Sequence, residues 1–398
     1  MAKSGCKNRN GNRNEMIFDN IIGPAKSADW FFRFWPVLAS SFVGSLAATW
    51  LCKKVAIKFG IVDRPDDLVK THKEPIAYLG GAGMLIGLTI GVMAGMASLR
   101  NEEFFSPALK WLLGILIGGT IACFLGLADD IFDIKPMQKI LGQAAAAVML
   151  LLVGIMPGLC YIAERLHLPM PHNIEMVLGG IVVILFVVGA ANSLNLLDGL
   201  DGLCAGVTAI ITIAMLLLSI YLATWGYSEV GDPVRIIICL GLVGVVCGFL
   251  PFNRYPAKIF MGDAGSMLLG FMVAALMLLF SERVPRWWMA SIVVFGLPIL
   301  DTAVALVRRL LNHRPLFVSD RGHIYDQMID RGIPLKRTVT ICYVLAGIYA
   351  AIGLIMSQIR TRYAAVVYVL VFVVSGLVVW KKGYLKMEGL RGAIHKEA

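Results

Sequence analysis

Eleven apolar stretches, each close to the length that crosses a lipid bilayer, constrain the fold of this chain more than any other feature. A transmembrane helix needs roughly 20 mostly apolar residues to span the hydrocarbon core. The stretches cover residues 36–52, 79–99, 111–128, 138–156, 176–191, 203–224, 234–251, 266–281, 287–307, 338–356 and 364–380. Lipid-facing backbone must satisfy its hydrogen bonds within the segment, and stretches this long and uniformly apolar do not match barrel strands. The sequence therefore predicts an all-α polytopic membrane protein with about 11 transmembrane helices.

Composition supports the membrane class and excludes several others. Apolar residues other than glycine make up 58% of the chain and charged residues 16%. Soluble domains have about 45–50% apolar residues with glycine counted and about 25% charged residues. The net charge of +10 is spread too evenly for a nucleic-acid-binding patch, and none of the eight cysteines forms a Cys-x-x-Cys pair. We therefore expect no nucleic-acid partner, zinc site or disulfide framework.

The distribution of Lys and Arg predicts the orientation. Loops on one side of the predicted helices hold 22 of these residues and loops on the other side hold eight, although the N-terminal tail adds six to the second side. Because basic loops stay in the cytoplasm, we place the 22-charge face there, in the inner (plasma) membrane, with the N-terminus outside and the C-terminus inside. We divide the chain into a disordered polar tail with an aromatic interfacial anchor (1–34), a transmembrane domain (35–380) and a basic cytoplasmic tail (381–398).

The unusual polar motifs all fall in five loops of that one face, which predicts a single site assembled at the membrane surface. The first loop carries Lys70 and His72 ahead of Gly80 and Gly81. Basic groups beside a Gly-Gly turn suit phosphate contact, since glycine lets backbone approach closely. The alternative is a positive-inside loop that leads into a helix.

Two further loops place carboxylates at predicted helix ends. Asp129 and Asp130 are adjacent, with Lys139 following, and neighbouring carboxylates repel unless a proton or a cation such as Mg²⁺ neutralises them. In the fourth loop, Asp263 lies in Gly-Asp-x-Gly-Ser at a helix start, where free N–H groups favour an anion, and Phe260 precedes it as a ring that could stack on a planar group. The alternatives are a solvated helix end and a simple helix cap.

The third loop is the most distinctive. Asn192, Asn195, Asp198 and Asp201 recur every three residues, so a helical or turn conformation would gather two amides and two carboxylates on one face. Gly199 lies among them and would permit close approach of a ligand. The alternative is a purely structural turn.

The fifth loop, residues 308–337, is basic and carries Arg321 and His323. It could cover the site, and a solvated basic loop is the equal alternative. Asp301 lies inside the ninth apolar stretch, where a carboxylate is either functional or paired with a neighbour such as Arg308.

Together these motifs resemble the polyprenyl-phosphate N-acetylhexosamine-1-phosphate transferases over residues 36–380. The resemblance rests on the His72 loop, Asp129-Asp130, the Asn-x-x-Asn-x-x-Asp-Gly-x-Asp-Gly run at 192–202 and the segment from Pro256 to Ser266. It implies that a polyprenyl phosphate attacks the β-phosphorus of a UDP-N-acetylhexosamine and releases UMP.

The resemblance also implies residue roles. By motif, Asn195 and Asp263 look like ligands of Mg²⁺, for which Mn²⁺ could substitute. Asp129 and Asp130 look like the pair that orients or deprotonates the lipid phosphate, with Lys139 beside the phosphates. Further positions resemble the uracil-contacting set, namely Gly199, Asp201 and Phe260. Asp198 looks like an organiser of the phosphate site.

One departure from the family pattern bears on the sugar. The usual His-x-His-His motif reads His323-Ile324-Tyr325-Asp326 here, so only His323 carries over as a catalytic or donor-binding candidate, together with Arg321. The three-histidine run of the muramoyl-pentapeptide branch is absent, which favours the N-acetylglucosamine branch and leaves the phospho-N-acetylmuramoyl-pentapeptide transferases as the alternative. A homodimer also stays open.

Two more distant classes fit less well. An intramembrane prenyltransferase would need a second Asp-x-x-x-Asp motif, which 192–202 does not supply. A secondary transporter would place its polar groups near the bilayer midplane in broken helices, whereas here they lie at the ends of the stretches.

Overall fold

The computed structural model describes residues 25–63, 75–165, 170–314 and 322–385. This part of the chain is helical apart from one pair of short strands and the connecting loops. The elements are α1 (Ala25–Phe59), β1 (Val62–Asp63), β2 (Ile76–Ala77), α2 (Gly80–Leu99), α3 (Phe105–Phe132), α4 (Pro136–Val153), α5 (Leu159–Arg165), α6 (His172–Leu197), α7 (Leu203–Thr224), α8 (Gly231–Asn253), α9 (Gly262–Leu279), α10 (Pro285–Val294), α11 (Gly296–Leu311), α12 (Ile324–Asp330), α13 (Leu335–Gln358) and α14 (Thr361–Lys381). Most of both predicted tails, residues 1–24 and 386–398, lies outside the described residues.

The all-α membrane class is confirmed, and every predicted stretch is helical. Within the described ranges, nine helices are long and apolar enough to span a membrane, or ten if the bent pair α10–α11 is one span. The helix α4 is the remaining stretch, and its apolar part is shorter, covering Pro136–Leu152. The structure thus supports nine or ten such helices where the sequence predicted about 11.

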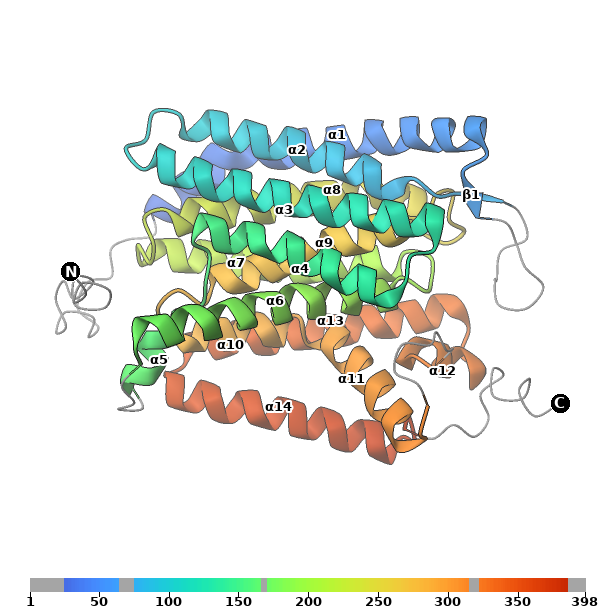
Figure 1. Cartoon of the computed structure of the whole chain (residues 1–398). Helices are drawn as coiled ribbons and strands as arrows, with labels where there is room; N and C mark the ends of the chain where they lie inside the picture. The colour runs from blue at the N-terminus through green and yellow to red at the C-terminus, as the bar shows by residue number, and fades with distance from the viewer. Residues whose placement is uncertain (1–24, 64–74, 166–169, 315–321, 386–398) are drawn as a thin grey trace.

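The ninth predicted stretch is broken. Its two halves, α10 and α11, meet at an angle of 69°. Pro298 has no amide hydrogen for the carbonyl one turn earlier, so the helical ladder is interrupted there. Gly296 packs against Tyr349, whose ring carbon Cδ1 would lie 2.5 Å from an added Cβ. The bend directs α11 away from the bundle axis (Figure 1).

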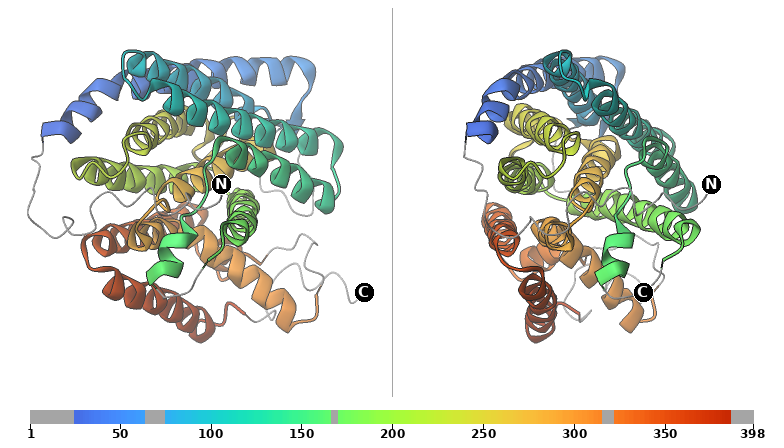
Figure 2. Two further views of the ribbon diagram at one scale, coloured as in Figure 1. Left: turned by 60° about the vertical axis from the view of Figure 1, so that its left-hand side comes forward. Right: turned by 90° about the vertical axis from the view of Figure 1, so that its left-hand side faces the viewer.

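Burial is concentrated on two central helices. The apolar windows of α9 and α8 are 94% and 89% buried, whereas that of α14 is 11% buried. The helix α9 contacts α2, α3, α6 and α8, and the end-on view shows it surrounded by other helices (Figure 2). An apolar α14 with so little buried surface suits contact with lipid.

The five motif loops share one end of the bundle. The chain reverses direction at each end, so the described residues that directly follow α1, α3, α6, α8 and α11 lie at the right-hand end in Figure 1, with β1 and α12. The start of α1 and the segment between α2 and α3 lie at the opposite end. The described parts of the five loops therefore share one end, and the assignment of this end to the cytoplasm stays a prediction.

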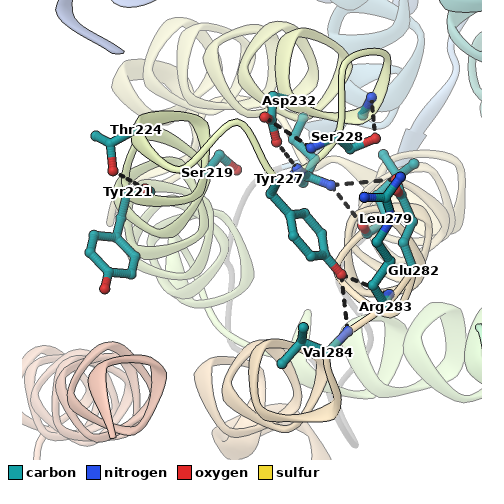
Figure 3. A network of polar contacts seen from close by, with 12 residues as sticks. Ser219, Tyr221, Thr224, Tyr227, Ser228, Asp232, Leu279, Glu282, Arg283 and Val284 are labelled. Carbon is teal, nitrogen blue, oxygen red and sulfur yellow. Dashed lines mark hydrogen bonds and ion pairs between the residues drawn. The ribbon is translucent and has the colours of Figure 1, made fainter. Parts of the chain in front are cut away.

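A buried ion-pair cluster closes the opposite end. Arg235, near the start of α8, is 0% exposed; it pairs with Asp232, approaches Glu282 at 3.6 Å and donates to the Leu279 carbonyl at 2.8 Å. Figure 3 shows Asp232, Leu279 and Glu282 gathered with Tyr227. Burial raises the pKa of Glu282, and the Arg235 charge opposes this shift. The cluster joins the ends of α8 and α9 and takes no part in the site described next.

Candidate active site

A small backbone network fixes the starts of α2 and α9 side by side. The N–H of Phe260 donates to the Ala77 carbonyl at 2.9 Å. The N–H groups of Gly80 and Gly81 donate to the carbonyls of Phe260 and Met261, both at 3.0 Å. The amides of the Gly-Gly pair, which the sequence suggested for phosphate contact, are thus engaged in this network.

Two glycines allow α2 and α3 to approach the first turn of α9 closely. A Cβ on Gly81 would lie 2.3 Å from the backbone nitrogen of Gly265. A Cβ on Gly126 would lie 2.2 Å from the backbone oxygen of Asp263. Because these neighbours are backbone atoms, a side chain at either position would displace the helix start.

Asp130 caps α9. Its Oδ1 accepts the N–H of Asp263 at 2.8 Å and its Oδ2 accepts the N–H of Ala264 at 3.2 Å. The first N–H groups of a helix lack partners within the helix, and a carboxylate there is favoured by the helix dipole. These two amides, which the sequence offered to a substrate anion, are therefore occupied by Asp130.

Asp129 has different partners from its neighbour. Its Oδ1 accepts the N–H of Ile134 in the turn after α3 at 3.0 Å, and its Oδ2 pairs with Lys139. Lys139 also donates to Oδ2 of Asp263 at 3.2 Å. One ammonium thus links a carboxylate of α3 to the carboxylate that begins α9.

These groups line a cavity of about 600 Å³ at the loop end of the bundle. Among its described lining residues are five aspartates and a single basic residue, Lys139. Tyr78 also lines it, and burial, followed by the charges of Asp130 and Asp263, raises the pKa of its hydroxyl well above the ordinary value. The cavity is therefore strongly negative and suited to a cation.

The residues present fit a magnesium ion bound jointly with phosphate. In the part of the chain that the structure describes, no cluster of three or more His, Cys, Asp or Glu side chains could hold a metal alone. Mg²⁺ is usually held by one or two carboxylates together with substrate phosphates and water. Asp263 supplies a carboxylate in the cavity, and the Asn195 amide donates to Ser266 at 3.1 Å in the same helical turn, which leaves its oxygen as an acceptor.

The polar series of the third loop does not form one ligand face. Asn192 on α6 donates to Gln143 of α4 at 2.8 Å, and Asn195 turns toward α9. Asp201 accepts the N–H of Ala257 at 2.9 Å and so holds the segment between α8 and α9. Asp198 lies just after α6, where burial, followed by the charges of Asp263 and Asp130, raises the pKa of its carboxyl well above the usual range.

Tyr325 lies against the end of α6, and His323 stacks on the Tyr325 ring. The Tyr325 hydroxyl donates to the Leu196 carbonyl at 2.8 Å, and a Cβ on Gly199 would lie 2.2 Å from that hydroxyl. The close approach that Gly199 permits is thus used by Tyr325. Asp301 binds His323, with Oδ2 and Nδ1 2.7 Å apart. Its partner is therefore His323 and not Arg308, which donates to the Gly322 carbonyl.

The structure brings together some of the predicted site residues and separates others. Four line the cavity, namely Asp129, Asp130, Lys139 and Asp263. Phe260 adjoins it through its ring contact with Tyr78, and Asn195 bonds to Ser266 in the first turn of α9, which Asp263 begins. Four others are absent from its described lining, namely Asp198, Gly199, Asp201 and His323, and Lys70, His72 and Arg321 lie outside the described residues.

Sequence reasoning missed Tyr78, Asp63 and Asp133, which also line the cavity. Tyr78 directly precedes the stretch that begins at Leu79, and its place next to the Gly-Gly pair was the available signal.

Comparison with known proteins gives a consistent picture. The sequence profile of glycosyl transferase family 4 matches residues 112–281. The chain is similar to a probable undecaprenyl-phosphate N-acetylglucosaminyl 1-phosphate transferase of Bacillus subtilis, with 29% identity over 88% of this chain and 90% of that protein.

Two further relatives cover most of the chain. An undecaprenyl-phosphate alpha-N-acetylglucosaminyl 1-phosphate transferase of Yersinia pestis is 31% identical over 79% of this chain and 82% of its own length. A decaprenyl-phosphate N-acetylglucosaminephosphotransferase of Mycolicibacterium smegmatis is 29% identical over 79% of each chain.

Proposed function

The chain belongs to glycosyl transferase family 4, and from this we propose that it transfers N-acetylglucosamine-1-phosphate from UDP-N-acetylglucosamine to a polyprenyl phosphate. The phosphate oxygen of the lipid attacks the β-phosphorus of the donor, the bond to UMP breaks, and a polyprenyl-diphosphate sugar remains. The observation that carries the proposal is the cavity in which Asp129, Asp130, Lys139 and Asp263 meet. The product lipid serves as the start of a cell-envelope polysaccharide.

The position of the cavity suits one substrate from each phase. It lies where apolar helices end, so a polyprenyl tail in the bilayer and a nucleotide sugar in water can both bring a phosphate to it. We place this end in the cytoplasm because its loops carry most of the basic residues. The reaction breaks one phosphoanhydride bond, in the donor, and forms another, in the product lipid. Catalysis therefore depends mainly on positioning the two phosphates and on neutralising their charge.

The residues around the cavity divide this work. The side chain of Lys139 is 26% exposed and pairs with the carboxylates of Asp129 and Asp263. When Lys139 releases one of these carboxylates, its ammonium group can bind a phosphate oxygen of a substrate. Asp129 receives or directs the proton of the lipid phosphate, and Asp130 holds the start of α9 through two amides. Asp263 and Asn195 would hold Mg²⁺, which when bound neutralises charge that develops on the diphosphate.

A transfer assay with purified full-length protein tests the proposal. Radiolabelled UDP-N-acetylglucosamine and undecaprenyl phosphate should yield a labelled lipid and an equal amount of UMP, and added UMP should reverse the reaction. Chelation by EDTA should stop transfer, and Mg²⁺ should restore it. Transfer from UDP-N-acetylmuramoyl-pentapeptide, with none from UDP-N-acetylglucosamine, would assign the chain to the alternative branch.

A further inference from the structure

Tyr78 lines the cavity but has no part in the roles described above. Its backbone N–H donates to the Ile61 carbonyl at 3.2 Å. Its ring meets the Phe260 ring edge to face, with centroids 6.3 Å apart and an interplanar angle of 87°. The tyrosine is thus held through its backbone and through its ring, so the position of its hydroxyl is set before a ligand enters.

The hydroxyl of Tyr78 lies among carboxylates without binding any of them. The charges of Asp130 and Asp263, followed by those of Asp198 and Asp63, all act on it. Within the part of the chain that the structure describes, it makes no hydrogen bond. A tyrosine hydroxyl ordinarily has a pKa of about 10, and burial followed by these charges raises the pKa further, so the proton stays on the oxygen at neutral pH. Tyr78 therefore offers an O–H donor that the described protein leaves unused.

The other donors around the cavity are already engaged. Among the described lining residues, Lys139 is the only other one whose side chain carries an N–H or O–H group when the carboxyls are ionised, and it pairs with Asp129 and Asp263. The backbone amides of the Gly-Gly pair and of the first turn of α9 donate to carbonyls and to Asp130. A phosphate brings only acceptor oxygens and negative charge into this cavity, so it needs a donor that no carboxylate has taken.

We propose that the hydroxyl of Tyr78 donates a hydrogen bond to a phosphate oxygen of a substrate bound in the cavity. This inference rests on the proposed function, which brings two such groups there, the monophosphate of the polyprenyl lipid and the diphosphate of the nucleotide sugar. An O–H donor to a charged phosphate oxygen makes a short, strong hydrogen bond. Because the phenol is neutral, it forms no ion pair with the surrounding carboxylates, as a second lysine would, and it needs no reordering when the phosphate arrives.

The substitution Tyr78→Phe removes the hydroxyl and keeps the ring that packs on Phe260. Equilibrium dissociation constants should be measured with the purified full-length protein and Mg²⁺, separately for UDP and for undecaprenyl phosphate. Tyr78→Phe should weaken the binding of at least one of these ligands roughly 10- to 10²-fold, the scale of a hydrogen bond to a charged group. The ligand that is weakened identifies which substrate phosphate the hydroxyl contacts.

Two controls separate the phosphate from the rest of each ligand and the cavity from its surroundings. Uridine and undecaprenol, which lack the phosphates, should bind the wild type and Tyr78→Phe alike. Tyr255 is a tyrosine at the same end of the bundle that is 50% exposed and absent from the described lining of the cavity. Tyr255→Phe should therefore leave both dissociation constants within about twofold of the wild type.

Two results would overturn the proposal. One is that UDP and undecaprenyl phosphate both bind Tyr78→Phe as tightly as they bind the wild type. The other is that uridine or undecaprenol loses as much affinity as its phosphorylated counterpart, because the effect would then come from the ring and not from the hydroxyl.

A second pair of variants gives the same answer if Tyr78→Phe does not fold. Position 78 can carry 4-aminophenylalanine or 4-methylphenylalanine, which are similar in size but differ in that only the amino group donates a hydrogen bond. The amino variant should bind the phosphate ligand more tightly than the methyl variant. Equal binding by the two would contradict the proposal.

Sugar transfer by the same proteins separates this inference from the proposed function. A wild type that binds UDP and undecaprenyl phosphate but transfers no sugar from any UDP-N-acetylhexosamine would refute the proposed function alone. A Tyr78→Phe variant with unchanged binding of both ligands, in a protein whose wild type transfers sugar, would refute the role of Tyr78 alone. A wild type that binds neither ligand would refute both.

Discussion

Replacing Gly126 by alanine should impair transfer although Gly126 has no side chain to offer to chemistry. Gly126 lies on α3, where it faces the first residues of α9. An added Cβ would lie 2.2 Å from the oxygen and 2.3 Å from the carbon of the Asp263 carbonyl, and 2.4 Å from the Ala264 nitrogen. All three are backbone atoms, so no side-chain rotation relieves the overlap.

The size of the effect follows from these distances. Ordinary contact begins at 3.4 Å, so the start of α9 must retreat by about 1.2 Å, the difference between 3.4 and 2.2 Å. That retreat moves the Asp263 carboxylate and stretches the two hydrogen bonds that Asp130 makes to α9. A displacement of about 1 Å at a positioned group can cost on the order of 10²-fold in rate. We expect a loss of this size in kcat.

Gly119→Ala is the matched control, two turns earlier on the same helix. Its Cβ would meet only side chains, the Met272 sulfur at 3.1 Å and Leu268 at 3.2 Å, which can shift by a few tenths of an ångström. Initial rates of lipid labelling and thermal unfolding in detergent should be measured for both variants. The reasoning is refuted if folded Gly126→Ala transfers sugar at a rate within about twofold of Gly119→Ala.

Three other outcomes are expected. Asp263→Asn should fold and lose about 10²-fold or more in turnover, and near-normal turnover with unchanged Mg²⁺ dependence would remove Asp263 from the ligand pair. Arg235→Met should lower the free energy of unfolding by about 3–5 kcal/mol, because it leaves buried carboxylates without their cation, while turnover per folded molecule is retained; an unchanged thermal midpoint would contradict this. In a cysteine-free background, single cysteines at Lys135 and Arg254 should react with an impermeant thiol reagent from the same side and a cysteine at Arg283 from the other, and mixed labelling of the first two would refute the shared end.

The sequence was sufficient for the class of fold and for the gathering of the motif loops, because both depend on apolar length and on the alternation of helix direction. The break between α10 and α11 was not predicted, because apolar length alone was used for the ninth stretch; Gly296 and Pro298 near its middle were the available signal. Nor did apolar length place the end of α4, which stops at Val153 because Gly154 adopts a left-handed conformation there.

For the site, residue types were predictable and residue partners were not. Adjacent acids such as Asp129 and Asp130 repel in any arrangement, but only the packing of α9 on α3 decides that one binds Lys139 and the other binds backbone amides. The spacing of Asn192, Asn195 and Asp201 suggested one face. Asn192 and Asn195 lie on α6 and bind α4 and α9, which pack on different sides of it, whereas Asp201 comes after α6 has ended at Leu197 and binds Ala257.

The first turn of α9 is the element around which the site is built. Residues 262–266 form hydrogen bonds with Asp130 of α3 and Asn195 of α6. Gly126 of α3 and Gly81 of α2 pack against the same turn, so three helices hold it in place. That turn belongs to one of the most buried helices of the described chain, and a group on so rigid an element keeps its place while substrates exchange. Lys139 lies near the start of α4, a helix with few buried residues, and reaches the carboxylates on a long flexible side chain. We therefore expect Asp263 to stay fixed through the reaction cycle and Lys139 to be the group that changes partners when a phosphate enters.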